Sequence, residues 1–121
     1  MATPAAPDPQ ALLPLSTPVF HILLSLYQRE LHGYAIIQDI ERRTDGEVGL
    51  STSTLYGAIK RMMRDGLVER SAERPDPDLD DERRRYYSIT EFGRAVARAE
   101  ASRIERLARL AKSARLLTPT P

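Results

Sequence analysis

The sequence predicts a mainly α-helical protein with a small β-hairpin, in which a winged helix-turn-helix is followed by a long C-terminal helix. Helical apolar patterns recur three times between residues 17 and 66, and Asp-Gly pairs end the second and the third. Two strand-like segments, 67–74 and 85–90, then flank a turn-rich loop, as in a hairpin. A run without proline extends from 91 to 115. Three helices followed by a hairpin is the order of a winged helix-turn-helix.

The length of 121 residues and the hydrophobic content of 41% favour one globular domain. Residues 1–14 carry four prolines and are expected to form a flexible arm. We expect the winged helix-turn-helix over 15–90, a dimerisation helix over 91–115 and a flexible tail over 116–121. The chain has no cysteine, no secretory signal and no apolar run near the ~20 residues that span a bilayer. These features predict a soluble cytoplasmic protein without a membrane partner.

The first two helices are expected to form the core. Thr17-Pro18 offers a hydroxyl cap with proline at the first helical position, and the apolar run 19–27 predicts a buried helix that ends between Gln28 and Glu30. The second helix is predicted over 32–43, and Asp45-Gly46 ends it. Its apolar face consists of Tyr34, Ile36, Ile37 and Ile40.

The third helix begins with four hydroxyl residues, Ser51 to Thr54, and ends at Asp65-Gly66. At ~100° per residue, Leu55, Ile59 and Met62 share one side. The opposite, polar and basic side carries Ser53, Gly57, Lys60 and Arg64, flanked by Tyr56 and Arg61.

Four hydroxyl groups are more than one helix cap requires. The first backbone N–H groups of a helix lack internal partners, and the helix dipole favours an anion there. Ser51 is the predicted cap, while Thr52, Ser53 and Thr54 are predicted to face outward and to bond phosphate or base edges. Lys60 and Arg64 would reach phosphate groups further along. We therefore predict that this helix enters the major groove of double-stranded DNA. The alternative is an ordinary surface helix with surplus hydroxyls.

In the hairpin, arginines at 83–85 precede Tyr86 and Tyr87. We predict that Arg84 and Arg85 contact the minor groove or phosphate. The alternative is a solvated charge run, because five carboxylates lie between residues 76 and 82 and can pair with these arginines. Of the 18 basic residues 16 are arginine, which suits phosphate and base edges but also follows from GC-rich coding.

The last helix is too long for so small a domain and is expected to pair with a second copy of the chain. A narrow seam of small residues bordered by leucines supports this prediction. A two-fold dimer would also set two reading helices about one duplex turn apart. The alternative is a helix that folds back on the first one. The predicted dimer interface comprises Val96, Ala97, Ala101, Ile104, Leu107, Ala108, Leu110 and Ala111.

Four stretches resemble the PadR family of bacterial transcriptional regulators: L-H-G-Y-A-I (31–36), S-T-S-T-L-Y (51–56), D-G-L-V (65–68) and R-R-R-Y-Y-S-I-T (83–90). The resemblance covers roughly residues 12–112, and the single C-terminal helix resembles the compact subgroup. It implies a homodimeric repressor that binds an inverted repeat at its own or a neighbouring promoter and is relieved by a small molecule. It also implies that Tyr34 and Tyr56 lie at or near DNA.

The chain departs from the family pattern in two places: Ser53 stands where glycine is common, and the wing loop is long and acidic. It has no tryptophan, so the binding of flat aromatic drugs between tryptophans cannot be carried over. The residues predicted to contact DNA are Tyr34, Ser51, Thr52, Ser53, Thr54, Tyr56, Gly57, Lys60, Arg61, Arg64, Arg84 and Arg85. An apolar space for a small aromatic or hydrophobic effector is predicted near Phe20, Leu24, Ile104 and Leu107.

The sequence also bears on two other classes of function. A winged-helix protein-interaction module without DNA binding suits the net charge of only +1 and the acidic loop. An enzyme is not expected, because phosphate loops, nucleophile elbows and acid pairs are absent from the sequence. His21 and His32 stand eleven residues apart without a carboxylate or cysteine pattern, and are interpreted as a core and a helix-end histidine. We expect no catalytic residue, metal or cofactor.

Overall fold

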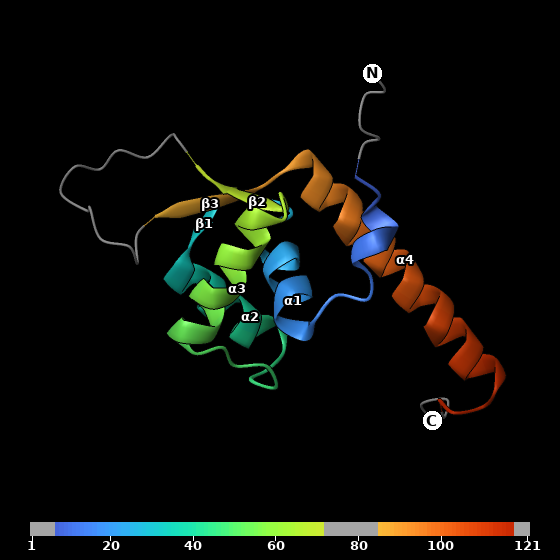
Figure 1. The fold of residues 1–121 in the computed structure, drawn as a ribbon. Helices are drawn as coiled ribbons and strands as arrows, with labels where there is room; N and C mark the ends of the chain where they lie inside the picture. The colour runs from blue at the N-terminus through green and yellow to red at the C-terminus, as the bar shows by residue number, and fades with distance from the viewer. Residues whose placement is uncertain (1–6, 72–84, 118–121) are drawn as a thin grey trace, which may run out of the picture.

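A computed structural model describes residues 7–71 and 85–117 (Figure 1). It is mostly helical with a small antiparallel sheet, which confirms the predicted fold class. In chain order the elements are η1 (Pro9–Leu12), α1 (Thr17–Leu26), β1 (Leu31–His32), α2 (Gly33–Arg43), α3 (Thr52–Arg64), β2 (Val68–Arg70), β3 (Tyr86–Ile89) and α4 (Glu91–Ser113).

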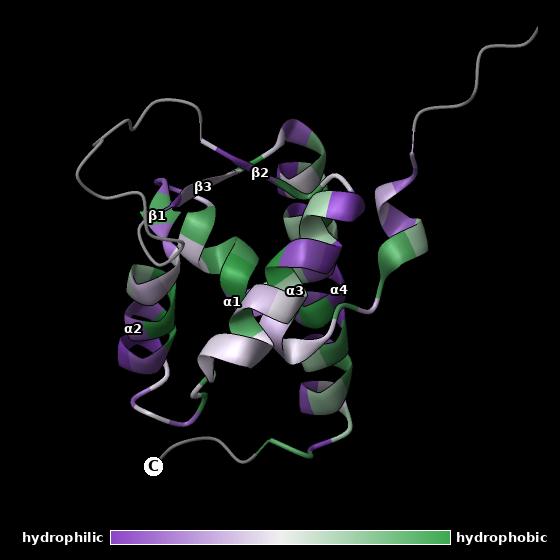
Figure 2. Cartoon of the chain, turned by 60° about the vertical axis from the view of Figure 1, so that its left-hand side comes forward, coloured by the Kyte–Doolittle hydropathy of each residue, from purple (hydrophilic) through white to green (hydrophobic). Residues whose placement is uncertain are grey.

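The helices α1, α2 and α3 pack against one another and form the body of the domain. Figure 2 shows α1 green along most of its length, as its apolar sequence predicts, whereas α2 alternates between apolar and polar residues. Tyr34 is an exception on α2, because it is exposed although it was placed on the apolar face. The fully buried side chains of the body include Ile22, Leu23, Leu26, Ile36, Ile40, Leu55 and Met62.

The boundaries of α1 differ from the prediction at both ends. Its cap is Ser16 rather than Thr17, since the Ser16 hydroxyl accepts a hydrogen bond from the Val19 N–H at 3.4 Å. The helix ends at Leu26, before the predicted end, because the chain must turn within four residues to enter β1. His21 is half-buried on α1 rather than in the core.

The sheet contains a strand that the sequence did not predict. β1 pairs with β3 through Leu31–Tyr87 and His32–Tyr86, and β2 pairs with the other side of β3 through Val68–Ile89. All pairs are antiparallel, so the predicted hairpin is part of a three-stranded sheet in the order β1-β3-β2. His32 also caps α2, as a helix-end histidine was expected to do, because its Nδ1 accepts the Ala35 N–H at 3.1 Å.

The long helix α4 begins at the sheet and runs away from the body (Figure 1). The Thr90 hydroxyl caps it by accepting the Gly93 N–H at 2.9 Å, as predicted. Gly93 allows the helix to start this close to the sheet, because a Cβ there would lie 2.1 Å from the Leu67 carbonyl oxygen. The 23 residues of α4 extend about 34 Å, and the helix contacts α1 and η1. Residues 9–12, within the segment predicted as a flexible arm, thus form a short helix against α4.

Candidate nucleic-acid interface

The N-terminus of α3 presents the hydroxyl cluster Ser51–Thr54. Ser51 is the cap, as predicted: its hydroxyl oxygen accepts the Thr54 N–H at 3.1 Å. The same oxygen lies 2.9 Å from the Thr54 hydroxyl and 3.2 Å from that of Ser53. All four residues are exposed. Their hydroxyl groups and the first N–H groups of the helix therefore form one solvent-facing, hydrogen-bonding end with the positive end of the dipole behind it.

The rest of α3 separates into a buried and an outward face. Its buried residues, Leu55, Ala58, Ile59 and Met62, belong to the core. Lys60, Arg61 and Arg64 are exposed, whereas Gly57 is half-buried. Arg64 lies 4.0 Å from the Asp65 carboxylate, a weak surface contact. The helix Thr52–Arg64 contains no acidic residue, so it carries three positive charges although the whole chain carries a net charge of only +1.

Tyr34 and Tyr56 play different structural parts. Tyr34 is 57% exposed near the start of α2, where it is available to a partner. Tyr56 is half-buried and packs against the core. Its ring lies directly against Gly33, where an added Cβ would stand 2.4 Å from the Tyr56 hydroxyl. The glycine of the H-G-Y stretch and the tyrosine of the L-Y stretch thus fit together and fix α3 on α2.

At the hairpin, only part of the predicted contact surface can be described. Arg85 is half-buried immediately before β3, and Arg70 is exposed at the end of β2. The imidazole of His32 meets the Tyr86 ring edge-on at a centroid distance of 5.4 Å, which links the start of α2 to the second hairpin strand. Arg84 and the acidic segment 76–82 lie outside the described residues.

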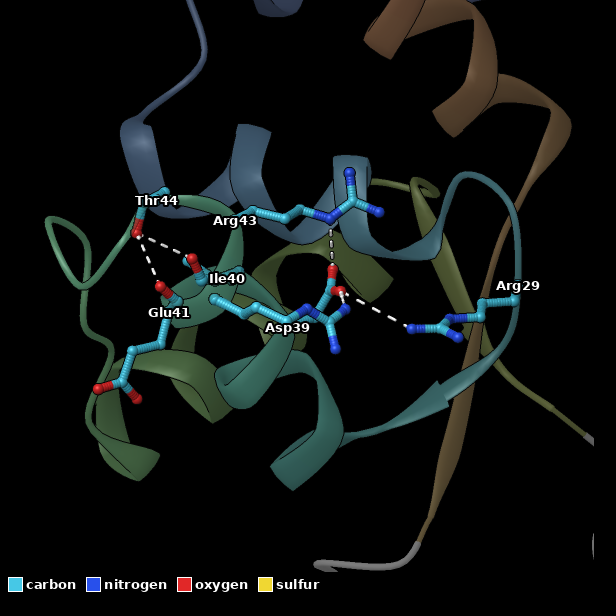
Figure 3. Close-up of polar contacts among 7 residues, drawn as sticks. Arg29, Asp39, Ile40, Glu41, Arg43 and Thr44 are labelled. Atoms are coloured by element: carbon cyan, nitrogen blue, oxygen red, sulfur yellow. Dashed lines mark hydrogen bonds and ion pairs between the residues drawn. The ribbon is translucent and has the colours of Figure 1, made fainter.

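A buried carboxylate on α2, Asp39, was not predicted from the sequence. Asp39 is 2% exposed and forms ion pairs with Arg42 at 2.5 Å, Arg43 at 2.8 Å and Arg29 at 3.7 Å. Figure 3 shows Arg29 and Arg43 converging on it. Burial acts to raise the pKa of Asp39, but the guanidinium groups of Arg43 and Arg42 outweigh burial and hold the pKa below its ordinary value. An aspartate in the D-I-E-R-R segment with arginines three and four residues on was the available signal.

The predicted dimer interface on α4 divides into two parts. Val96 and Ala97 are 0% and 6% exposed because they pack in the core of their own protomer, so they are not available to a partner. The remaining positions lie further along α4. Ala111 is half-buried there, and five positions are exposed: Ala101, Ile104, Leu107, Ala108 and Leu110.

Two residues of the predicted effector site, Phe20 and Leu24, are half-buried on α1, and the other two, Ile104 and Leu107, are exposed on α4. The effector site remains a prediction.

The arrangement of three helices, an outward-facing α3 and a flanking sheet can be compared with known proteins. A family model described as the transcriptional regulator PadR-like family matches residues 22–99. The chain belongs to this family. The family is one of transcriptional regulators, a class of protein that acts on DNA. The sequence resemblance to the family is thereby confirmed.

Solved structures share the fold of this PadR-like chain. A transcriptional regulator from Clostridium thermocellum, Cth-833, superposes with a TM-score of 0.66 at 23% identity, covering 82% of this chain and 96% of that one. A PadR family transcription regulator from Clostridium difficile R20291 gives 0.66 at 21% identity, with 81% and 97% covered. A PadR-like regulator from Bacillus cereus gives 0.65 at 20% identity, with 84% and 92% covered. At these identities the likeness shows the fold alone.

A sequence relative is protein X of Lysinibacillus sphaericus, itself uncharacterised. It is 32% identical to this PadR-like chain over 74 residues, which make up 61% of this chain and 65% of that protein. The chain therefore spans less than two thirds of the length of that relative. Within 7–71 and 85–117, no helix has both the length and the apolarity to cross a bilayer.

Proposed function

We propose that this chain is a homodimeric repressor that binds an inverted-repeat operator through its two α3 helices. The observation that carries the proposal is the exposed hydroxyl end of α3, Ser51–Thr54, followed on the same helix by Lys60, Arg61 and Arg64 without an acidic residue. A helix that reads the major groove contacts base edges near its N-terminus and phosphates along its flanks.

Each part of this face has a proposed role. Thr52 and Ser53 read base edges, since short hydroxyl side chains allow the helix end to approach the groove floor. Lys60 and Arg64 neutralise phosphates and position the helix. Tyr34, exposed at the start of α2, donates its hydroxyl to a phosphate from the second helix of the motif. Tyr56 supports α3 from behind rather than reaching a base.

The remaining predicted positions have smaller parts. Ser51 and Thr54 order the first turn through their mutual hydrogen bonds. Gly57 leaves room for the backbone of α3 to approach the groove, and Arg61 extends the positive face beside it. Arg84 and Arg85 are proposed to add contacts from the hairpin.

The dimer is proposed to form through the distal half of α4. The buried residues of α4 all lie in its first half: Gly93, Val96, Ala97 and Glu100. The same face continues at helical spacing as Ile104, Leu107 and Ala111, of which Ile104 and Leu107 are 41% and 50% exposed. A second copy of α4 would cover these residues, together with Leu110 at 65% exposed.

Sedimentation can test this dimer. Leu107→Asp is expected to convert the protein to a monomer, because it sets a charge in the middle of the interface. Arg106→Ala, one residue earlier on another side of the helix, should leave the dimer intact. A Leu107→Asp protein that still sediments as a dimer would place the interface elsewhere.

Relief by a small molecule is proposed to act at the space between α1 and the dimer helices, near Phe20, Leu24, Ile104 and Leu107. Fluorine labels near these residues should respond to an apolar inducer. Candidate aromatics that release DNA without disturbing such labels would move the effector site away from this space.

The deciding experiment is fluorescence anisotropy with labelled DNA from upstream of the chain's own coding sequence, with random DNA as competitor. Phosphate contacts release counterions, so affinity should fall steeply between about 50 and about 200 mM salt. Tight binding that resists the competitor supports the repressor.

The second candidate function is a protein-interaction module, which the net charge of +1 favours. It predicts no preference for the upstream DNA over random DNA and little dependence of affinity on salt. That outcome would overturn the repressor proposal.

A further inference from the structure

A buried glutamate on α4, Glu100, joins the two ends of the described chain. Its side chain is 1% exposed. Its Oε2 accepts a hydrogen bond from the Leu15 backbone N–H at 2.6 Å, across 85 residues of sequence. Its Oε1 accepts a hydrogen bond from Nε of Arg103, whose side chain is 31% exposed. The bond from Arg103 lowers the pKa of Glu100, and together with the Leu15 N–H it outweighs burial, which acts in the opposite direction. The carboxylate is therefore charged and fully engaged at neutral pH.

Glu100 is one of three α4 side chains that bond to the residues flanking α1; Arg98 is another, since it donates a hydrogen bond to the Tyr27 hydroxyl at 3.2 Å. Leu15 lies two residues before α1, and Tyr27 directly follows it. Arg94 donates a hydrogen bond to the Tyr27 carbonyl at 2.8 Å, and its guanidinium lies 5.0 Å from the centre of the Tyr27 ring. The side chains of residues 94 and 100 on α4 are thus bonded to opposite ends of the same helix. Bonds at both ends of α1 constrain the angle at which α4 crosses it, together with the core packing of Val96 and Ala97.

Glu100 also stands where α4 leaves the body. The buried residues of α4 end at Glu100, and its large exposed apolar residues begin at Ile104. The segment beyond it, from 100 to 113, is about 20 Å long. A tilt of about 10° at Glu100 would displace the far end by about 3.5 Å, which matches the rise of one base pair, about 3.4 Å. A small change in the direction of α4 is therefore comparable in size to a change of one base pair in the separation of the operator half-sites.

A buried ion pair is a poor source of stability compared with apolar packing, but it accepts few arrangements. A leucine at position 100 would pack acceptably over a range of helix angles. Arg103 lies on the same helix and moves with Glu100, so the Leu15 N–H is the partner that the carboxylate meets only over a narrow range of helix directions. Its chemistry suits the selection of one geometry.

We propose that Glu100 is a positioning residue: its bond to the Leu15 N–H fixes the direction of α4 and thereby selects the spacing between operator half-sites. The half-site part of this inference rests on the proposed dimeric repressor. Glu100 itself does not contact DNA, and it acts through the helix that carries the dimer interface.

The direction of α4 can be measured within one protomer, without DNA. The chain has no cysteine, so Glu41→Cys on α2 and Arg109→Cys on α4 accept two spin labels. Labelled protein diluted with unlabelled protein gives the distance within a protomer by pulsed electron resonance. The distance distribution should be narrow in the parent, clearly broader or shifted with Glu100→Leu, and intermediate with Glu100→Gln, which keeps one acceptor. Glu105→Gln is the matched control, because Glu105 is exposed and, in the described structure, pairs at the surface with Arg109. Since Arg109→Cys removes that partner, the control is measured with the second label on Lys112→Cys instead.

The consequence for DNA is measured on operators whose half-site separation is changed by one and two base pairs. The parent should prefer one separation by about tenfold or more, the scale of a mismatched base pair. Glu100→Leu should reduce that preference severalfold. A purely structural role would leave both the distances and the preference alone, whatever the change in the urea midpoint of unfolding.

The outcomes separate this inference from the proposed function. An unchanged distance distribution in both Glu100 variants overturns the positioning role, whatever the DNA result. Broader distances with an unchanged spacing preference overturn the link to the operator. A parent that prefers no DNA at any separation overturns the proposed repressor, while the spin-label distances still decide whether Glu100 positions α4.

Discussion

Replacing Gly33 by alanine tests whether the contact between α2 and α3 is as close as the structure shows. A Cβ at position 33 would lie 2.4 Å from Oη, 2.8 Å from Cζ and 3.1 Å from Cε1 of Tyr56. Ordinary contacts between such atoms are about 3.5–4.0 Å, so the ring must move by about 1 Å. Tyr56 is half-buried against the core, which restricts where the ring can go.

Two effects of opposite sign decide the magnitude. Overpacking of a fitted contact costs about 1–3 kcal/mol. Alanine in place of glycine favours a helix by at most about 1 kcal/mol, and by less at position 33 because it is the first residue of α2. We therefore expect Gly33→Ala to lower the free energy of unfolding by about 1–2 kcal/mol.

Gly57 provides the control, since it is also a helical glycine. A Cβ there would meet only Nη1 of Arg61, at an ordinary 3.6 Å. Gly57→Ala should thus raise the free energy of unfolding by up to about 1 kcal/mol. Urea unfolding of both variants measures the difference. In a Tyr56→Phe background, which lacks the nearest atom, Gly33→Ala should cost less. If Gly33→Ala stabilises the protein as Gly57→Ala does, the ring is free to move aside and the reasoning is refuted.

Three further predictions concern single side chains. In the anisotropy assay, Lys60→Ala should weaken binding equally on operator and random DNA, and should flatten the slope of log affinity against log salt concentration by about one. The control is Lys112→Ala, at the only other lysine of the sequence, which should change neither the affinity nor the slope. Ser51→Ala removes the cap of α3 and should cost about 1 kcal/mol in urea unfolding, an expectation that an unchanged midpoint would contradict. Asp39→Asn should lower the free energy of unfolding by about 1–2 kcal/mol at pH 7, a modest value because solvent screens the exposed arginine partners. Because the pKa of Asp39 is lowered on folding, its contribution is present above the ordinary pKa and is lost as the pH falls, so parent and variant should converge below about pH 4 in urea titrations.

Local signals explain why much of the fold was predictable. The cap at Ser51, the turn at Gly66 and the cap at Thr90 each depend on residues within a few positions, and the structure has all three. The outward placement of Lys60 followed from helical periodicity alone. The resemblance carried on short motifs was confirmed by the family model over residues 22–99.

Long-range contacts explain what could not be predicted. β1 has only two residues and exists because it pairs with Tyr86 and Tyr87, more than fifty positions away. Val96 was predicted to lie in the dimer interface but is buried in its own protomer. Helical periodicity identifies an apolar face, but not which element packs on it. Glu100 has no local signal in the sequence, because the Leu15 N–H that it bonds lies 85 residues away along the chain.

The sheet order β1-β3-β2 bears on how the protein forms during synthesis. The central strand is the last of the three to be made, and it supplies the partner for both of the others. While the ribosome has produced the chain only as far as residue 70, the three helices of the body can collapse, but Leu31 and Val68 lie in strands that lack their native partner. The arrival of Tyr86–Ile89 completes both pairings at once, and α4 follows directly. A nascent chain stalled in the 72–84 segment would therefore expose unpaired strand edges to chaperones and proteases.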